Sequence, residues 1–333
     1  MTDLGKHSLL EVRDLKVHFP LKGGFLKRSR NVVHAVDGID LMIARGTTLS
    51  LVGESGCGKT TVGRCIIGLE KRTEGEVRLM GDRIDHLTPR RLHPFRRKMG
   101  MVFQDPFSSL NSRRRVLDLV AEPIRSHRLM PKAKIKERVI ELLGLVGLPH
   151  DAWSRWPHEF SGGQRQRICI ARALAGEPGL LICDESVSAL DVSVQAQILN
   201  LLVDLQARLG IAILFISHDL AVVEHLSHHV AVMYLGKIVE TADRDRLFAR
   251  PAHPYTQALL SAVPVPDPTS GGNRILLKGD VPSPTAPPSG CRFHTRCPHA
   301  FDRCRSVEPQ LQSAPDGGSV ACHLYDVPSF VKT

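Results

Sequence analysis

One eight-residue segment constrains the fold of this 333-residue chain more than any other. Residues 53–60 read GESGCGKT and fit the pattern G-x-x-x-x-G-K-[ST]. The apolar run TLSLV precedes the segment, and the helix-compatible run TVGRCIIGL follows it. A glycine-rich turn between a buried strand and a helix lets the backbone curl around phosphate oxygens at the positive end of the helix. The segment therefore predicts an α/β fold with a nucleotide phosphate site.

The residues of this phosphate loop have separate expected roles. Lys59 would reach the β- and γ-phosphates and act in catalysis, and Thr60 would supply a ligand to Mg²⁺. An ordinary glycine-rich turn is the alternative, which eight constrained positions between a strand and a helix disfavour. We therefore expect ATP and Mg²⁺ as cofactors. The further loop residues expected to bind the nucleotide are Gly53, Ser55, Gly56, Gly58 and Thr61.

A second half of the site is expected at residues 180–185, where the apolar run LLIC ends in two carboxylates. The carboxyl end of a parallel strand borders the ligand site of the sheet, so these side chains can face the phosphates. Asp184 would hold Mg²⁺ directly or through water, and Glu185 would polarise the attacking water. A solvated strand end is the usual interpretation of an Asp-Glu pair, but the phosphate loop upstream favours the catalytic one.

The two parts of the chain differ in sequence pattern and proline content, which indicates two domains. Residues 1–250 alternate apolar runs with helical patterns, as a mostly parallel α/β sheet requires, whereas residues 251–333 are proline-rich and exclude long helices. We expect a nucleotide-binding domain in the first part and a small cysteine-containing domain in the second. The expected strands are 48–52, 180–184, 211–216 and 230–234, with a helix over 193–209.

Charge and composition limit the expected partners and location of the protein. The formal net charge is +10, but the basic clusters at 96–98 and 113–115 are not interleaved with aromatics, so we expect no nucleic-acid partner. A solvated basic face is the ordinary explanation, and proximity to anionic lipid is the functional one. No apolar run approaches the roughly 18 residues of a membrane span, and the first residues lack a signal-peptide core, so the cytosol is the default location.

Residues 160–167 read FSGGQRQR and closely resemble the signature motif of ABC-type ATPases. The resemblance covers about residues 10–250 and implies a RecA-like parallel-sheet core, an antiparallel β subdomain and a helical signature subdomain. In this family the signature binds the γ-phosphate held by the opposite subunit, and the N–H groups at a helix start suit such an anion. The residues implied for this contact are Ser161, Gly162, Gly163 and Gln164.

The other elements of the ABC family follow in order along the chain. The resemblance implies that Gln104 contacts Mg²⁺ and senses the permease, and that Asp191 closes the D-loop SALD. It implies that His218, together with Glu185 and Lys59, is catalytic and contacts the γ-phosphate, although an ordinary loop histidine is the alternative. The family pattern predicts proline at position 186, where this chain has serine, and we interpret this as a local loop change.

Phe19, in the segment VHFP, is the candidate for stacking on adenine. A lone aromatic in a strand is more often part of the core, which is the alternative here. Residues 21–33 form an insertion before the next expected strand.

The segment HPYTQALL at 253–260 resembles the C-terminal element of oligopeptide and dipeptide importers, most closely their F-type ATPase subunit. The resemblance implies a heterodimer with a D-type ATPase subunit, two transmembrane permeases and an extracytoplasmic substrate-binding protein. It places the chain peripherally on the cytoplasmic face of the inner membrane. Related nickel and glutathione importers share the pattern, so the cargo is less specific than the mechanism.

Four cysteines lie within 32 residues near the C-terminus, at Cys291, Cys297, Cys304 and Cys322. Disulfides are disfavoured in a reducing cytosol. Structural zinc is an alternative, although its usual C-x2–4-C pairs are absent. Four thiolates also suit a [4Fe–4S] cluster, which the resemblance favours; free thiols are the remaining alternative. A metal centre here would stabilise a segment too small for a core of its own, and redox sensing is the second possible role.

Two rival classes of function make different demands on the sequence. A soluble ABC ATPase acting on nucleic acid or the ribosome would have tandem nucleotide domains or a coiled-coil insertion, and this chain has neither. A metal-sensing regulator would have lost its catalytic groups, whereas Glu185 and His218 are present. The expected function is therefore ATP hydrolysis coupled to the import of dipeptides or oligopeptides.

Overall fold

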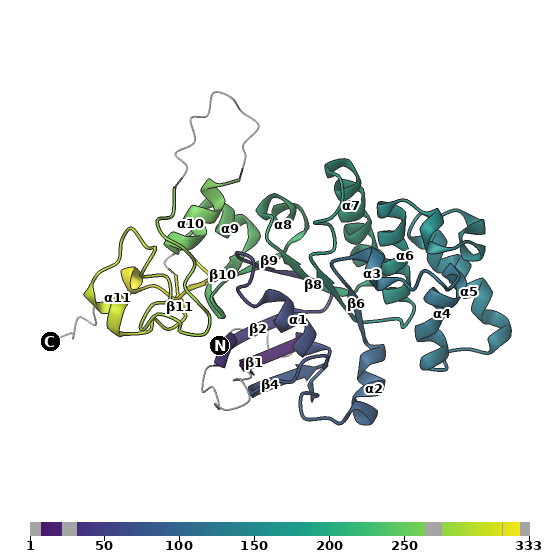
Figure 1. Ribbon diagram of the computed structural model, residues 1–333, viewed down its shortest axis with the longest axis horizontal. Helices are drawn as coiled ribbons and strands as arrows, with labels where there is room; N and C mark the ends of the chain where they lie inside the picture. The colour runs from purple at the N-terminus through teal and green to yellow at the C-terminus, as the bar shows by residue number, and fades with distance from the viewer. Residues whose placement is uncertain (1–7, 22–31, 264–274, 315, 327–333) are drawn as a thin grey trace.

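The computed structural model describes residues 8–21, 32–263, 275–314 and 316–326, so most of the insertion expected at 21–33 lies outside the described residues. Its centre is an eight-stranded sheet in the order β11-β12-β10-β9-β3-β8-β7-β6 (Figure 1). The strands are β3 (Thr48–Val52), β6 (Met99–Val102), β7 (Leu180–Asp184), β8 (Ala212–Ser217), β9 (His229–Tyr234), β10 (Lys237–Asp243), β11 (Gln312–Ser313) and β12 (Ser319–Val320).

Parallel pairing joins β6, β7, β8, β3 and β9 at the centre of this sheet. Every residue of β3, β7 and β8 is buried, as expected for parallel strands whose two faces are both covered. Leu181 and Phe215 face one core and Ile182 and Leu214 the other, because side chains alternate along a strand. The four strands expected from the sequence are confirmed, two of them with one-residue shifts at their ends.

Different layers cover the two faces of the central sheet (Figure 1). Helices α7 (Val192–Leu209) and α8 (Leu220–Leu226) pack on one face. Helix α1 (Lys59–Ile66) packs on the other, together with the second sheet. Helix α7 confirms the prediction for 193–209 and ends at Gly210, which has a left-handed φ of 63° and closes the helix.

The second sheet is antiparallel, in the order β2-β1-β4-β5. It matches the antiparallel β subdomain that the resemblance implies, and its apolar side forms one core with α1. Its elements, with the helix that follows, are β1 (Ser8–Pro20), β2 (Val32–Ala44), β4 (Glu74–Leu79), β5 (Asp82–Arg83) and α2 (Pro89–Arg97).

A group of helices extends from the β6 edge of the central sheet and matches the implied helical subdomain (Figure 1). Its buried side chains, such as Leu119, Val139 and Ile168, belong to the same core as α7 and α8. The helices are α3 (Pro106–Ser109), α4 (Val116–Ser126), α5 (Lys132–Leu145) and α6 (Gly162–Leu174), with 3₁₀ turns at His150–Ser154 and Pro157–Glu159.

Residues after 250 add short elements to the opposite edge of the central sheet. Strand β12 pairs with β10 through Val320 and Glu240, so this segment extends the sheet rather than standing apart from it. Among the described residues, no helix could cross a membrane. Helix α9 (Arg244–Ala249) precedes this segment, whose own helices are α10 (Pro254–Ser261) and α11 (Asp302–Ser306), with a 3₁₀ turn at His323–Tyr325.

Candidate functional site

The phosphate loop links β3 to α1 and has a conformation that requires glycine. Gly53 has a φ of 153°, and a Cβ there would lie 2.1 Å from the carbonyl oxygen of Met233. Gly58 has a φ of 109°, and a Cβ there would lie 2.0 Å from the carbonyl oxygen of Ala35. Both contacts are to backbone atoms of neighbouring strands, so no side-chain movement could relieve them. Gly56, by contrast, faces open space.

Lys59 is the first residue of α1 and is only 4% exposed. Its Nζ donates to the carbonyl oxygens of Gly53 at 2.8 Å and Glu54 at 2.9 Å. Ser55 and Gly56 are exposed above it, and Thr61 continues the helix. The ammonium group is therefore held inside the loop by two carbonyl groups that a phosphate oxygen could replace.

Thr60 and Asp184 bring the phosphate loop together with the end of β7. The Oγ1 of Thr60 donates to the Oδ1 of Asp184 at 2.8 Å. Asp184 is 2% exposed, and this burial raises the pKa of its carboxyl group, partly offset by the hydrogen bond from Thr60. A hydroxyl and a desolvated carboxylate are the oxygen ligands that Mg²⁺ prefers, so these residues fit that ion.

Glu185 lies between two other residues expected from the sequence. Gln104 Nε2 donates to Glu185 Oε2 at 2.8 Å, and His218 Nδ1 lies 3.5 Å from Glu185 Oε1. The backbone of Glu185 has a φ of 44°, and its N–H donates to the carbonyl oxygen of Ile216 at 3.0 Å. A non-glycine residue in this region carries backbone strain, which the neighbouring β8 strand holds in place.

The signature residues open α6 in a different part of the molecule (Figure 1). Ser161 Oγ accepts from the N–H of Gln164 at 3.3 Å, and Gln164 Oε1 accepts from the N–H of Ser161 at 3.1 Å, which forms a capping box. Gly163 packs so closely against Val194 that a Cβ would come within 2.3 Å of its Cγ1. Gly162, beside it, is half-buried. Among the described residues, no hydrogen bond joins this helix start to the phosphate loop.

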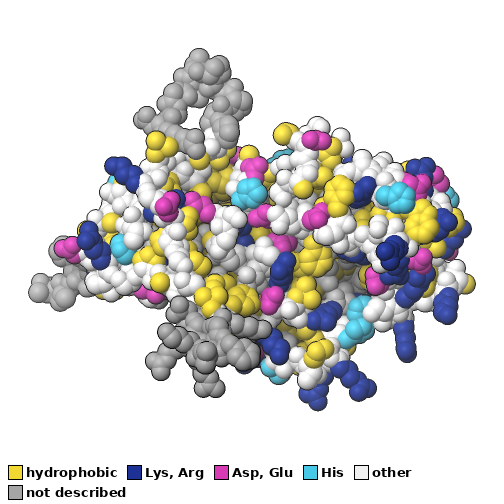
Figure 2. All heavy atoms as spheres, viewed as in Figure 1, with side chains coloured by type: hydrophobic (Ala, Val, Ile, Leu, Met, Phe, Trp, Pro, Cys, Tyr) yellow, Lys and Arg dark blue, Asp and Glu magenta, His cyan; other side chains and the backbone are white. Residues whose placement is uncertain are grey.

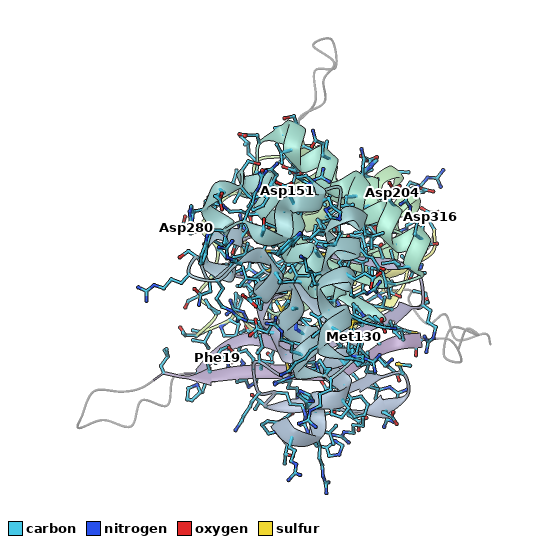
Figure 3. All side chains as sticks on the ribbon, turned by 90° about the vertical axis from the view of Figure 1, so that its right-hand side faces the viewer. Phe19, Met130, Asp151, Asp204, Asp280 and Asp316 are labelled. Carbon is cyan, nitrogen blue, oxygen red and sulfur yellow. The ribbon has the colours of Figure 1, made fainter. Side chains whose placement is uncertain are left out.

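Two other expected residues also lie outside the cluster around Glu185. Asp191 is exposed at the start of α7. Phe19 is 37% exposed near the end of β1 and belongs to neither large apolar core (Figure 3). The core alternative for Phe19 is therefore not what the structure shows, and adenine stacking stays a prediction.

The four C-terminal cysteines share one neighbourhood. Cys304 and Cys322 are buried, and Cys291 and Cys297 are half-buried. Burial raises the pKa of Cys291 to about 11 and that of Cys322 to about 12, with smaller contributions from the neighbouring cysteines. The N–H of Cys291 donates to the carbonyl oxygen of Cys304 at 2.8 Å.

These cysteines do not form a ready-made site for a single ion. Among the described residues, the group of three ligand atoms that lie within 4.8 Å of one another belongs to His18, His34 and Asp37 instead. Four thiolates at the Zn–S distance of about 2.3 Å would place the sulfurs about 3.8 Å apart. Zinc would therefore require the cysteine side chains to move closer together.

Residues from the C-terminal part also contact the phosphate loop, which sequence reasoning missed. Tyr255 Oη accepts from the N–H of Glu54 at 2.9 Å, and Arg296 forms two hydrogen bonds to the Glu54 carboxylate. The sequence shows the tyrosine of the HPYT segment and an arginine directly before Cys297, but neither local pattern predicts a contact with Glu54.

Comparisons with known proteins agree with this geometry. Residues 36–188 match the family model described as ABC transporter, and residues 239–304 match that of the oligopeptide/dipeptide transporter C-terminal region. The chain is 53% identical over 317 residues to a probable peptide ABC transporter ATP-binding protein, y4tS of Sinorhizobium fredii, covering 95% of this chain and 90% of the relative. It is 49% identical to the oligopeptide transport ATP-binding protein AppF of Bacillus subtilis, covering 98% of this chain and 100% of the relative. It is 50% identical to the oligopeptide transport ATP-binding protein OppF of Escherichia coli, covering 93% of this chain and 94% of the relative.

Solved structures show the same fold. The ABC transporter component cbiO1 from Clostridium perfringens matches with a TM-score of 0.62 and 29% identity, covering 73% of this chain and 92% of that one. A dimeric ATP-binding cassette, MJ0796, bound to ADP and Pi, matches with a TM-score of 0.62 and 27% identity, covering 71% of this chain and 98% of that one. The chain belongs to the ABC transporter family, as an ATP-hydrolysing subunit with the C-terminal region of oligopeptide/dipeptide transporters.

Proposed function

We propose that this chain binds MgATP and hydrolyses it to power the import of dipeptides or oligopeptides. The observation that carries the ATPase mechanism is the convergence of Lys59, Asp184 and Glu185 at the carboxyl ends of β3 and β7. The peptide cargo is supported by relatives described as peptide and oligopeptide transport proteins. Nickel and glutathione are the alternative cargoes for the same mechanism.

In this proposal each residue of the cluster has one task. Lys59 exchanges its two carbonyl partners for phosphate oxygens, and Thr60 and Asp184 would hold Mg²⁺. The ion neutralises charge on the phosphates when it is bound. Glu185 accepts a proton from the attacking water, and His218 donates a hydrogen bond to the γ-phosphate. Gln104 orients the Glu185 carboxylate, would contact the ion, and responds to the permease.

The helix start at Ser161 supports a head-to-tail dimer. Ser161 and Gln164 are exposed and cap each other, and the N–H groups of Gly162 and Gly163, for which the described residues offer no hydrogen-bond partner, are suited to an anion. We propose that these residues, with Gly162 and Gly163, bind the γ-phosphate held by a second subunit, and that Asp191 lies at the same interface. Phe19 would stack on the adenine of the nucleotide. The second subunit is proposed to be a D-type ATPase.

The other proposed partners are two membrane permeases and an extracytoplasmic binding protein, which would place this chain on the cytoplasmic face of the membrane. Figure 2 shows Lys and Arg side chains gathered over α2 and the helical part, where an anionic lipid surface or permease could lie near them. We propose that residues 1–250 form the ATPase domain and that residues 251–333 form a region that attaches to it. The transporter descriptions of the relatives favour this reading over a soluble ABC ATPase.

We further propose that Cys291, Cys297, Cys304 and Cys322 hold a [4Fe–4S] cluster. Each thiolate of such a cluster binds a different iron, so its sulfurs lie farther apart than the ligands of one zinc ion, and the proposal rests on the four cysteines that share this neighbourhood. The proposed role is structural: among the described residues Phe293 joins the main core, but the separate apolar cluster around Cys322 is small, with Ala252, Ala314, Val320 and Cys322 and with Tyr325 against it. Anaerobic purification with iron, sulfide and zinc analysis tests this: about four irons per chain, lost in Cys297→Ser, supports the cluster, and one zinc or no metal contradicts it.

The transport proposal is tested by reconstitution. The chain, its partner ATPase and the two permeases would be placed in liposomes with ATP inside and the binding protein outside. Uptake of a labelled dipeptide, competed by oligopeptides but not by nickel or glutathione, is the expected result. Uptake of nickel or glutathione instead would transfer the mechanism to that cargo.

A further inference from the structure

The side chain of Glu54, the second residue of the phosphate loop, is held by the C-terminal region. Arg296 Nη1 lies 2.7 Å from Glu54 Oε2, and Arg296 Nη2 lies 3.1 Å from Oε1. The arginine side chain is 8% exposed and the glutamate side chain 28%. A two-pronged pair of this kind fixes the direction of both groups as well as their distance. The hydrogen bond to Glu54 also raises the pKa of Arg296, so its charge is constant.

The backbone of Glu54 is held by the same region. Its N–H donates to the Oη of Tyr255 at 2.9 Å, and Tyr255 is fully buried. Its carbonyl oxygen accepts from Lys59 Nζ, the group expected to bind the β- and γ-phosphates. The N–H of Glu54 shares a peptide unit with the Gly53 carbonyl, which also accepts from Lys59 Nζ, so the orientation of the two peptide units on either side of Glu54 determines where the ammonium group is held before ATP arrives.

Arg296 is part of a segment that is anchored next to the loop. The N–H of Arg296 donates to the carbonyl oxygen of Phe293 at 3.0 Å. The Phe293 ring packs against Tyr234 with a centroid distance of 5.2 Å and against Tyr255 with a distance of 5.4 Å. Cys297 follows Arg296 directly in the chain. A change in the backbone at Cys297 would thus move the arginine that holds Glu54.

We infer that Arg296 is a positioning residue for the phosphate loop and couples the four-cysteine segment to ATP binding. The inference rests on the proposed role of residues 53–60 as the ATP phosphate site. Arg296 touches no reacting group; it acts through Glu54 and the peptide units that hold Lys59. Its loss should therefore weaken ATP binding and raise KM while leaving kcat at saturating ATP nearly unchanged.

A double-mutant cycle on the intact chain tests the pair. Arg296→Gln and Glu54→Gln are each expected to weaken binding of a fluorescent ATP analogue about tenfold, and the double variant is expected to be no weaker than either. Arg296→Lys should be intermediate, because it keeps the charge and loses one prong. The matched control is Arg303→Gln: Arg303 also directly precedes a cysteine, but it pairs with Asp326 at 3.1 Å, away from the loop.

The coupling is tested with Cys297→Ser. We expect this change to weaken ATP binding in the wild-type background and to add nothing in the Arg296→Gln background. Multiplicative losses in either cycle, or wild-type affinity in Arg296→Gln, would overturn the inference. Thermal melting identifies a variant that does not fold, and in that case Glu54→Gln, which changes only the loop, carries the test by its KM. Lys59→Ala separates the two proposals, because wild-type ATP affinity in that variant would refute the phosphate-site assignment itself.

Discussion

Replacing Glu185 by glutamine should separate ATP binding from ATP hydrolysis. The change removes one negative charge and keeps the length of the side chain. The amide oxygen can still accept the hydrogen bond that Gln104 Nε2 donates at 2.8 Å, so the local geometry should persist. Lys59, Thr60 and Asp184 make their own hydrogen bonds without Glu185, so nucleotide binding should be unaffected.

The expected loss of turnover follows from the role of the carboxylate. A positioned general base contributes about 10²- to 10⁴-fold, or roughly 3–5 kcal/mol of barrier, and glutamine cannot accept the proton. Phosphate release at saturating MgATP measures the loss, and a fluorescent ATP analogue measures the affinity. Size-exclusion chromatography with ATP should show more dimer for Glu185→Gln than for the wild type, because the γ-phosphate, which is proposed to join the subunits, is not removed.

The matched control is Glu177→Gln. Glu177 also has a positive φ, of 56°, but its side chain is 50% exposed and pairs with Arg97 at 3.2 Å outside the site. Its turnover should equal that of the wild type, since exposed ion pairs contribute little. Turnover of Glu185→Gln within a factor of three of the wild type would refute the assignment of Glu185 as the base.

Three further predictions concern stability and the loop. Asp184→Asn should raise the melting temperature and abolish Mg²⁺-dependent hydrolysis. Burial raises the pKa of the Asp184 carboxyl, so its ionised form lowers the free energy of unfolding at pH values above the unfolded pKa. An unchanged or lower melting temperature would contradict this. Burial lowers the pKa of His253 to about 3, so below pH 6.5 the unfolded chain binds a proton that the native one does not. Stability should fall by roughly 2 kcal/mol from pH 7 to pH 5 on this account, and less in His253→Asn, which keeps a cap acceptor for α10; equal slopes in urea titrations would exclude it. Gly58→Ala should abolish ATP-analogue binding, because its Cβ would meet a backbone oxygen at 2.0 Å, whereas Gly144→Ala in α5, with no atom within 4 Å, should bind normally and melt about as high or higher.

Local patterns were sufficient to predict the parts of the site that are contiguous in the chain. The strand before Gly53 and the strand ending at Asp184 are apolar runs that can only be buried, and their bounds are confirmed. The start of α6 was likewise expected at the signature motif, and the structure adds the cap that Ser161 and Gln164 form across three residues. Each of these features depends on neighbours in the sequence and on the period of one strand or helix.

Contacts between distant segments could not be predicted in this way. Arg296 and Glu54 are 242 residues apart, and nothing in either local sequence names the other. Strand β12 has two residues, too few for a pattern of its own, and exists because β10 offers it a free edge. The left-handed φ of Glu185 is likewise set by β8 rather than by the glutamate's own preference.

The two halves of the site differ in how firmly they are held, and this matches their tasks. The phosphate loop is fixed by contacts that cannot yield: Gly53 and Gly58 lie against backbone oxygens, and Lys59 is 4% exposed. The catalytic side is more open, since the His218 side chain is 52% exposed and Gln104 is exposed as well. A rigid loop binds phosphates without reorganising, whereas exposed side chains can change partners when a second subunit covers them. ATP can therefore bind to one chain, and the open catalytic side leaves room for the second subunit proposed above, whose signature helix would complete the site for hydrolysis.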